Sequence, residues 1–169
     1  PFILKIKRTG EEIWSRFYGG SADDAFYDIA KIDNRIFCVG KSRSKEGDIT
    51  DWRLPERNRG WLCEIDSYGN VINSKTYDLQ SISKIANGLP FDELEQKEKT
   101  ITVACQRDNR KGPRVIIMDM NGSVTRSVDF NDYTKITGLC RARTKNGQPG
   151  FAVAGLKVYG TKEVDSTGN

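Results

Sequence analysis

Two short acidic segments contain the residue types that could do chemistry. Asp23 and Asp24 are adjacent, Asp28 follows four residues later, and the segment GDITD carries Asp48 and Asp51. Carboxylate oxygens are the ligands that Ca²⁺ prefers, and paired carboxylates can act as a general acid and base. The alternative is that these side chains accept hydrogen bonds from backbone amides of their own turns. We expect this second role, because neither segment has the spacing or the terminal glutamate of an EF-hand loop.

The chain contains no histidine. The commonest general base and the commonest metal ligand are therefore both missing. A catalytic triad or a Cys-His dyad of the usual kind cannot be built from these 169 residues. The Gly19-Gly20-Ser21 stretch is no phosphate loop, because it lacks the lysine and the following helix. We assign no catalytic residue and no cofactor, and we expect a protein that is not an enzyme.

The four cysteines form no CxxC pair and show no spacing typical of a metal site. They are Cys38, Cys63, Cys105 and Cys140. Most lie in apolar, strand-like runs (IFCVG, GWLCEI, TVACQ), where a free cysteine behaves as a small buried hydrophobe. We therefore expect the cysteines to pack in the core, with disulfide bonds as the alternative.

One loop combines a tryptophan with several charged side chains. The inserted segment DITDWRLPERNRG carries Trp52, Arg53, Glu56, Arg57 and Arg59. An exposed tryptophan among arginines is typical of a contact with a protein or a glycan. The alternative is that Trp52 folds back onto the sheet. The other two tryptophans, Trp14 and Trp61, lie in strand patterns, and we expect them to pack between sheets.

The charge pattern argues against nucleic acid as a partner. The net charge is +4, and the basic residues alternate with acidic ones. A nucleic-acid surface usually needs a clustered basic stripe with aromatics between its charges. The short basic runs KIKR, RSK and RDNRKGPR are better explained as solvated strand edges, where charges discourage aggregation. No apolar run approaches the roughly 18 residues that a membrane span requires.

A recurring unit must position all of these residues. Three stretches align without a gap: FILKIKRTGEEIWSRFYGG (2–20), WLCEIDSYGNVINSKTYDL (61–79) and RVIIMDMNGSVTRSVDFND (114–132). In each, a glycine is followed eight residues later by an aromatic residue. The glycines are Gly10, Gly69 and Gly122, and the aromatics are Tyr18, Tyr77 and Phe130. The segment KEVDSTGN (162–169) matches the start of the unit again.

The repeated stretch predicts a hairpin. Apolar and polar residues alternate before the glycine, as in a half-buried strand, and the glycine can take the positive φ of a tight turn. A second pair of strands follows each hairpin, in residues 28–42, 83–107 and 135–157. The unit therefore has four strands, and variation falls in the segments between them, which we expect to be loops: DITDWRLPERNRG (48–60) and FDELEQKEK (91–99).

Four-stranded antiparallel units repeated in tandem are typical of a β-propeller. A β-sandwich is the rival fold, but it does not explain the ungapped repeat. We predict an all-β propeller segment of about three blade repeats, divided into a split blade, two repeats and a partial repeat. The predicted boundaries are 1–20, 21–79, 80–132 and 133–169.

Residues 10–80 resemble the units of bacterial secreted propeller-like repeat proteins. Those units read Trp-x-Lys-x-Tyr-Gly-Gly-Ser, a pair of acids, Gly-Asp-Val/Ile-Ser/Thr, and Trp-x-x-Lys-Leu-Asp-x-x-Gly-Asn. The matching residues are Trp14, Arg16, Tyr18, Gly19, Gly20, Ser21, Asp23, Asp24, Gly47, Asp48, Trp61, Asp66, Gly69 and Asn70. The second and third units lack the Gly-Gly-Ser stretch and the Gly-Asp-Ile-Thr loop. The resemblance implies a large bacterial protein, mostly extracellular, with a binding or structural role.

These observations lead us to expect a non-enzymatic binding or scaffold module of a larger secreted or cell-surface protein. A cytoplasmic location is the alternative. The expected partners are a protein or glycan ligand held by loops, and either further blades of a longer chain or a second copy that closes a six-bladed ring. We expect the longer chain. The rival functions are the propeller part of a glycan-active enzyme and an oligomeric lectin.

Overall fold

The computed structural model describes residues 1–51, 57–88, 99–107, 111–143, 145–147 and 149–157. The described residues form twelve β-strands in four antiparallel sheets and no helix, which confirms the predicted all-β class. Nothing in these residues is a helix long and apolar enough to cross a membrane.

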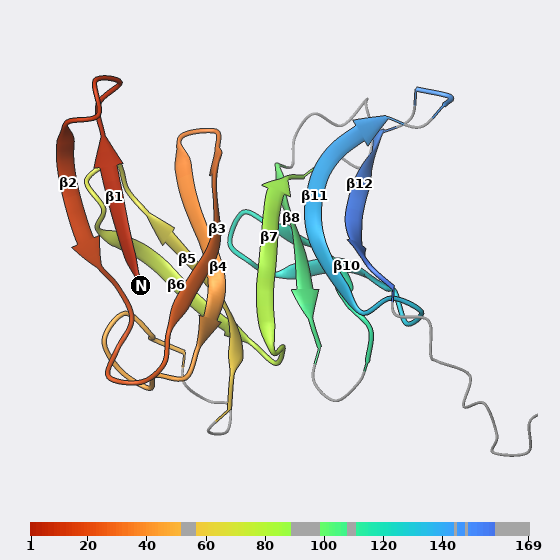
Figure 1. Ribbon diagram of the computed structural model, residues 1–169, viewed down its shortest axis with the longest axis horizontal. Coiled ribbons are helices and arrows are strands. Elements are labelled where there is room, and N and C mark those ends of the chain that lie inside the picture. The colour runs from red at the N-terminus through yellow and green to blue at the C-terminus, as the bar shows by residue number, and fades with distance from the viewer. Residues whose placement is uncertain (52–56, 89–98, 108–110, 144, 148, 158–169) are drawn as a thin grey trace, which may run out of the picture.

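The four sheets follow one another along the chain (Figure 1). The first sheet is the hairpin of β1 (Phe2–Ile6) and β2 (Glu12–Phe17). The second has the order β3 (Ala25–Ile32), β4 (Arg35–Ser42), β5 (Arg59–Ile65) and β6 (Val71–Tyr77). The third has the order β7 (Ser81–Asn87), β8 (Thr100–Gln106), β9 (Arg114–Asp119) and β10 (Val124–Asp129). The fourth is the hairpin of β11 (Lys135–Arg143) and β12 (Pro149–Leu156).

The hairpin turns of the repeat have one conformation. The glycines at these turns have φ of +89° at Gly10, +82° at Gly69 and +79° at Gly122, so they occupy the left-handed region that glycine tolerates best. In each turn the glycine N–H donates to the carbonyl three residues earlier, over 3.0–3.1 Å. Asp66 and Asp119 each accept two further backbone amides of their turns. The alternation and turn chemistry that predicted hairpins here are thus realised.

Neighbouring sheets pack face to face, and three apolar clusters join them in succession. The first and second sheets meet around Tyr18, Cys38, Trp61, Cys63 and Ile65. The Trp61 indole stacks on Phe26 with 4.4 Å between ring centroids, and its Nε1 donates to Ser74 Oγ over 2.9 Å. Trp61 is fully buried, as predicted for a tryptophan packed between sheets.

The second and third sheets meet in the largest cluster. Phe37, Val39 and Leu62 of the second sheet contact an aliphatic surface of the third. That surface is formed by Leu79, Ile82, Ile85, Ile101, Val103, Cys105, Ile116 and Met118. A smaller cluster of Ala104, Val115 and Ile136 joins the third sheet to the fourth. Of the cysteines, Cys38, Cys63 and Cys105 are buried and free, as expected for core packing, whereas Cys140 is free and exposed.

A tyrosine bridges each of the first two interfaces. Tyr18, which follows β2, donates from Oη to the carbonyl oxygen of Gly69 over 2.9 Å. Tyr77, at the end of β6, donates to the carbonyl oxygen of Gly122 over 2.6 Å. These are equivalent positions of the repeat, so the recurring aromatic of one unit is hydrogen-bonded to the turn glycine of the next. We call this pair of groups the Tyr–Gly clamp. At the third interface Phe130 takes the aromatic position and packs against the cluster without a hydroxyl.

The described sheets do not close into a ring or barrel, so the propeller architecture remains a prediction. Residues 1–20, 21–79, 80–132 and 133–157 each contain one sheet. The segment 91–98, predicted to be a loop, lies outside the described residues.

Candidate functional site

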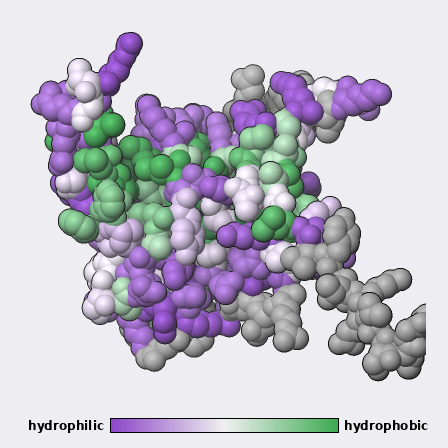
Figure 2. Space-filling view, viewed as in Figure 1, coloured by the Kyte–Doolittle hydropathy of each residue, from purple (hydrophilic) through white to green (hydrophobic). Residues whose placement is uncertain are grey.

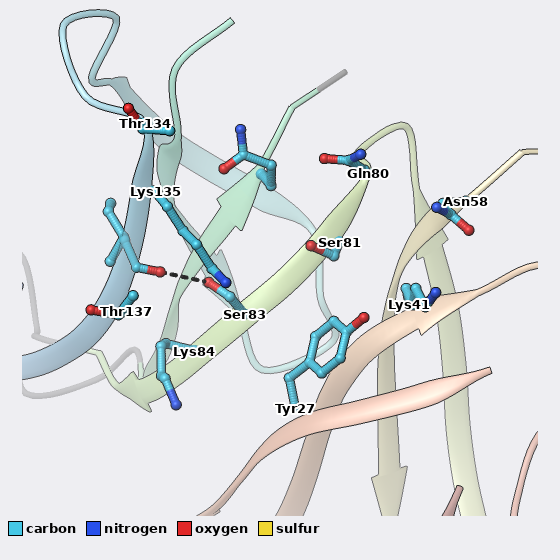
Figure 3. Close-up of a pocket in the computed structure, with 12 residues that line it drawn as sticks. Tyr27, Lys41, Asn58, Gln80, Ser81, Ser83, Lys84, Thr134, Lys135 and Thr137 are labelled. Carbon is cyan, nitrogen blue, oxygen red and sulfur yellow. Dashed lines mark hydrogen bonds between the residues drawn. The ribbon is translucent and has the colours of Figure 1, made fainter. Parts of the chain in front are cut away.

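A groove of about 770 Å³ lies where the first strands of three successive sheets meet (Figure 3). Tyr27 comes from β3, Ser81, Ser83 and Lys84 come from β7, and Lys135 comes from β11. Each of these strands is the edge strand of its sheet. β7 contacts both β3 and β11, so the three edges lie side by side. The stacking of the sheets therefore creates the groove.

Cationic side chains supply the charge of the groove. Lys41 forms an ion pair with Asp23 across 3.5 Å at the rim. The side-chain ammonium groups of Lys84 and Lys135 form no ion pair or hydrogen bond with any described residue. No carboxylate is among the described residues that line the groove. A bound anionic group could therefore pair with the ammonium groups of Lys84 and Lys135. The carboxylates beside the groove are already engaged, since Asp23 pairs with Lys41 and Asp28 accepts from Ile85 N over 3.1 Å.

Neutral hydrogen-bonding groups surround these lysines. Ser83 Oγ lies 3.1 Å from the Ala104 carbonyl oxygen and 3.3 Å from that of Ile136, so it connects β7 to its own sheet and to β11. Figure 3 shows Lys135 extending from β11 toward Ser83, while the Tyr27 ring approaches from β3. The remaining polar liners are amides and hydroxyls: Asn58, Gln80, Gln106, Ser81, Thr134 and Thr137. Buried Ile136 supplies an apolar wall.

This mixture of groups can hold a ligand by hydrogen bonds, a half-exposed aromatic ring and Coulomb attraction. Sites for small molecules are concave and place a few polar groups over apolar surface. Sequence reasoning missed these residues. The signal that could have found them is the run of polar and cationic residues in the first strand of successive units, because a strand buried on both faces would be apolar.

The acidic pair singled out in the sequence lies in the segment between β2 and β3, where Asp23 pairs with the rim residue Lys41 and Asp24 is hydrogen-bonded to neighbouring loop groups. Asp24 accepts hydrogen bonds from Gly20 N over 2.8 Å, from Ser44 Oγ over 2.6 Å and from Arg43 N over 3.2 Å. Burial raises the pKa of Asp24, but these hydrogen bonds and one from Ser42 outweigh it and leave the pKa below its usual value. The carboxylate therefore stays ionised and ties the segment 20–24 to the segment 42–44.

The other acidic candidates are also placed by the structure. Asp48 accepts from Gly19 N over 2.9 Å, and the side chain of Asp23 is 74% exposed beside Lys41. Asp51 follows in the same loop, where its carbonyl oxygen accepts from Thr76 Oγ1 over 2.6 Å. Within the described ranges, no group of three or more His, Cys, Asp or Glu side chains could hold a metal ion. The Ca²⁺ ligands therefore stay a prediction. The observed partners of Asp24 are backbone amides and serine hydroxyls, and Asp48 accepts from the backbone amide of Gly19.

The predicted partner-contact loop is described only at its C-terminal end. Trp52, Arg53 and Glu56 lie outside the described residues. Arg57 forms an exposed ion pair with Asp78. Arg59 is only 2% exposed and donates to the Ser44 carbonyl oxygen, so it holds the backbone of the neighbouring loop.

Neither the protein-family models nor the curated proteins include a match to this chain. The groove, the stacked sheets and the clamps are therefore the observations from which a function can be argued.

Proposed function

We propose that the chain is a non-enzymatic β-propeller-type repeat domain that acts as a binding or scaffold module of a larger secreted or cell-surface bacterial protein. One observation carries the proposal: the first three sheets are joined in succession through equivalent faces and by the same Tyr–Gly clamp. A sheet that packs one face on the preceding sheet and the other face on the following sheet can be stacked repeatedly, as propeller blades are.

The strand order supports the propeller over the sandwich. Each four-stranded sheet follows the order of the chain, with its first strand at one edge and its fourth at the other. The first strands of the second, third and fourth sheets contact one another in succession, as the innermost strands of propeller blades do. A sandwich would instead distribute consecutive strands between two sheets by Greek-key connections.

The groove at these first strands is the binding surface that we propose. Its lysines, hydroxyls, amides and exposed Tyr27 ring suit a hydroxyl-rich ligand with acidic groups, such as an acidic glycan. Lys84 and Lys135 would pair with its anionic groups, and the tyrosine would contact a sugar face.

Glycan binding and turnover can be measured on the same protein. The 169-residue chain would be tested against an array of neutral and acidic glycans, followed by calorimetry on any hit. We expect the double substitution Lys84→Gln and Lys135→Gln to weaken binding at least tenfold. The pair Lys7→Gln and Arg8→Gln is a charge-matched control, because both residues are exposed in the β1–β2 hairpin. Equal affinity of both double variants would contradict the site, and release of reducing ends from a bound glycan would favour the enzyme alternative.

A further inference from the structure

The outer face of the first sheet is apolar and exposed. Phe2, Leu4, Ile6 and Phe17 share this face, with exposed fractions of 64%, 46%, 54% and 87%. Figure 2 shows hydrophobic side chains gathered over β1 and β2 at this side of the molecule. The opposite face of the hairpin, with Ile3, Trp14 and Tyr18, packs on the second sheet.

The repeat shows what covers this face elsewhere in the molecule. In the aligned repeat, the residues equivalent to Leu4 are Cys63 in the second sheet and Ile116 in the third, which are 0% and 4% exposed. Both are buried by the sheet that precedes them along the chain.

The position of Ile6 behaves in the same way. Ile65 and Met118 take this position, and they are 1% and 0% exposed. Both pack on the preceding sheet, in the same clusters as the equivalents of Leu4. Leu4 and Ile6 therefore occupy positions that the fold buries whenever a preceding sheet is present.

The turn glycines differ in the same way: the carbonyl groups of Gly69 and Gly122 accept a tyrosine hydroxyl, whereas that of Gly10 has no described donor. A Cβ built on Gly69 would lie 3.0 Å from Tyr18 Oη, and one on Gly122 would lie 2.5 Å from Tyr77 Oη. A Cβ built on Gly10 meets nothing within 4 Å, although its turn has the same φ and the same backbone hydrogen bond. Gly10 thus has the geometry of a clamp acceptor without a described donor.

We propose that Leu4, Ile6 and the carbonyl group of Gly10 form a socket for one more β-sheet of the same repeat type, supplied by polypeptide outside these 169 residues. The occupant presents an aliphatic and aromatic face like that of Phe37, Val39 and Leu62, and a tyrosine at the end of its outermost strand donates to Gly10 O. The socket depends on sheet stacking alone and would stand even if the groove bound no glycan.

A second copy of this chain is the less suitable occupant. Tyr18 and Tyr77, at the repeat position, already donate to glycines of their own chain. Phe130, at the third such position, has no hydroxyl to donate and is packed against the fourth sheet.

An extended chain tests the socket directly. Because residues 2–20 and 114–132 align without a gap, residues 1–113 can be joined to residues 2–169 at an equivalent point. The second copy of β1 and β2 then continues β7 and β8, and the first copy of Tyr77 faces the second copy of Gly10. We expect a monomer in which Leu4→Asp in the second copy lowers the melting temperature by on the order of 5 °C or more. The same substitution in the 169-residue chain should change it by no more than about 1 °C, because exposed sites are tolerant.

Matched variants decide the remaining outcomes. Tyr77→Phe in the first copy should lower the melting temperature of the extended chain, and a silent Tyr77→Phe would overturn the hydroxyl contact. A control extended chain carries Leu4→Ile and Ile6→Met in the second copy, which restores the side chains found at Ile116 and Met118. If this control folds while the unsubstituted extended chain does not, the socket is refuted. Sedimentation showing that the 169-residue chain forms a dimer broken by Leu4→Asp would assign the face to a second copy and refute the proposed occupant.

Discussion

Alanine substitution of two turn glycines separates the Tyr–Gly clamp from the conformation of the turn. Gly10 and Gly122 have φ of +89° and +79°, so an alanine at either position must adopt the left-handed region. That strain costs about 1–2 kcal/mol in each case. At Gly122 the new Cβ would also lie 2.5 Å from the hydroxyl of Tyr77, which would have to move away from its carbonyl acceptor.

The clamp adds a second cost at Gly122 only. Tyr77 is partly buried, and its displacement leaves a polar group without its hydrogen bond at a cost of about 1–3 kcal/mol. We therefore expect Gly10→Ala to lower the free energy of unfolding by about 1–2 kcal/mol. Gly122→Ala should lower it by roughly 2–5 kcal/mol, the sum of the strain and the lost hydrogen bond.

Urea unfolding followed by circular dichroism measures both variants. Tyr77→Phe supplies the second arm of a double-mutant cycle, in which it should cost less when Gly122 is already alanine. Tyr68→Phe is the matched control, because Tyr68 is 71% exposed in a turn. Equal costs for Gly10→Ala and Gly122→Ala would refute the reasoning, since the two positions would then differ in nothing but their place in the chain.

Three further predictions rest on buried polar and ionisable groups. Arg35→Met should destabilise the protein by about 3–5 kcal/mol in urea unfolding, because it leaves the buried Glu64 carboxylate without the guanidinium that contacts it at 2.5 and 2.6 Å. Adding Glu64→Leu to this variant should restore stability, because it removes the unpaired charge. No recovery would contradict this explanation. Burial, with a smaller contribution from neighbouring thiols, raises the pKa of Tyr18 from 10.0 to about 12. The stability that this group contributes is therefore complete below pH 10 and is lost as the pH rises toward 12. Over this range the melting temperature should fall less steeply with pH for Tyr18→Phe than for the unsubstituted chain, and equal slopes would contradict the assignment. A maleimide should modify the exposed thiol of Cys140 in the folded chain, with one adduct by mass spectrometry and none in Cys140→Ser, because burial raises the pKa of the other three thiols. Those thiols belong to Cys38, Cys63 and Cys105.

The local structure of this chain was predictable because short-range chemistry determines it. Alternating residues around Gly69 predict two strands and a turn, and β5 and β6 occupy these positions. The repeat predicted that the same hairpin recurs around Gly122, as β9 and β10 show. The burial of Cys38 followed from its place in an apolar run.

The groove and the clamps were not predictable from one sequence, because they depend on how separate units lie against each other. Nothing near Tyr77 in the sequence reveals that its hydroxyl reaches a carbonyl 45 residues further along. Likewise Tyr27, Lys84 and Lys135 are ordinary strand residues until three edges lie together. The acidic pair drew attention as a site because its hydrogen bonds to Gly20 and Ser44 cannot be seen in the sequence.

The Tyr–Gly clamp also bears on how a chain of this kind can grow by gene duplication. The second unit supplies Tyr77 to the unit after it and Gly69 to the unit before it. A duplicated unit therefore arrives with both halves of its contacts already matched to its neighbours, and no new interface has to evolve. Loss of one unit leaves the flanking units equally compatible. At the third interface Phe130 keeps the ring packed without a hydroxyl, so two units can also be joined by packing alone.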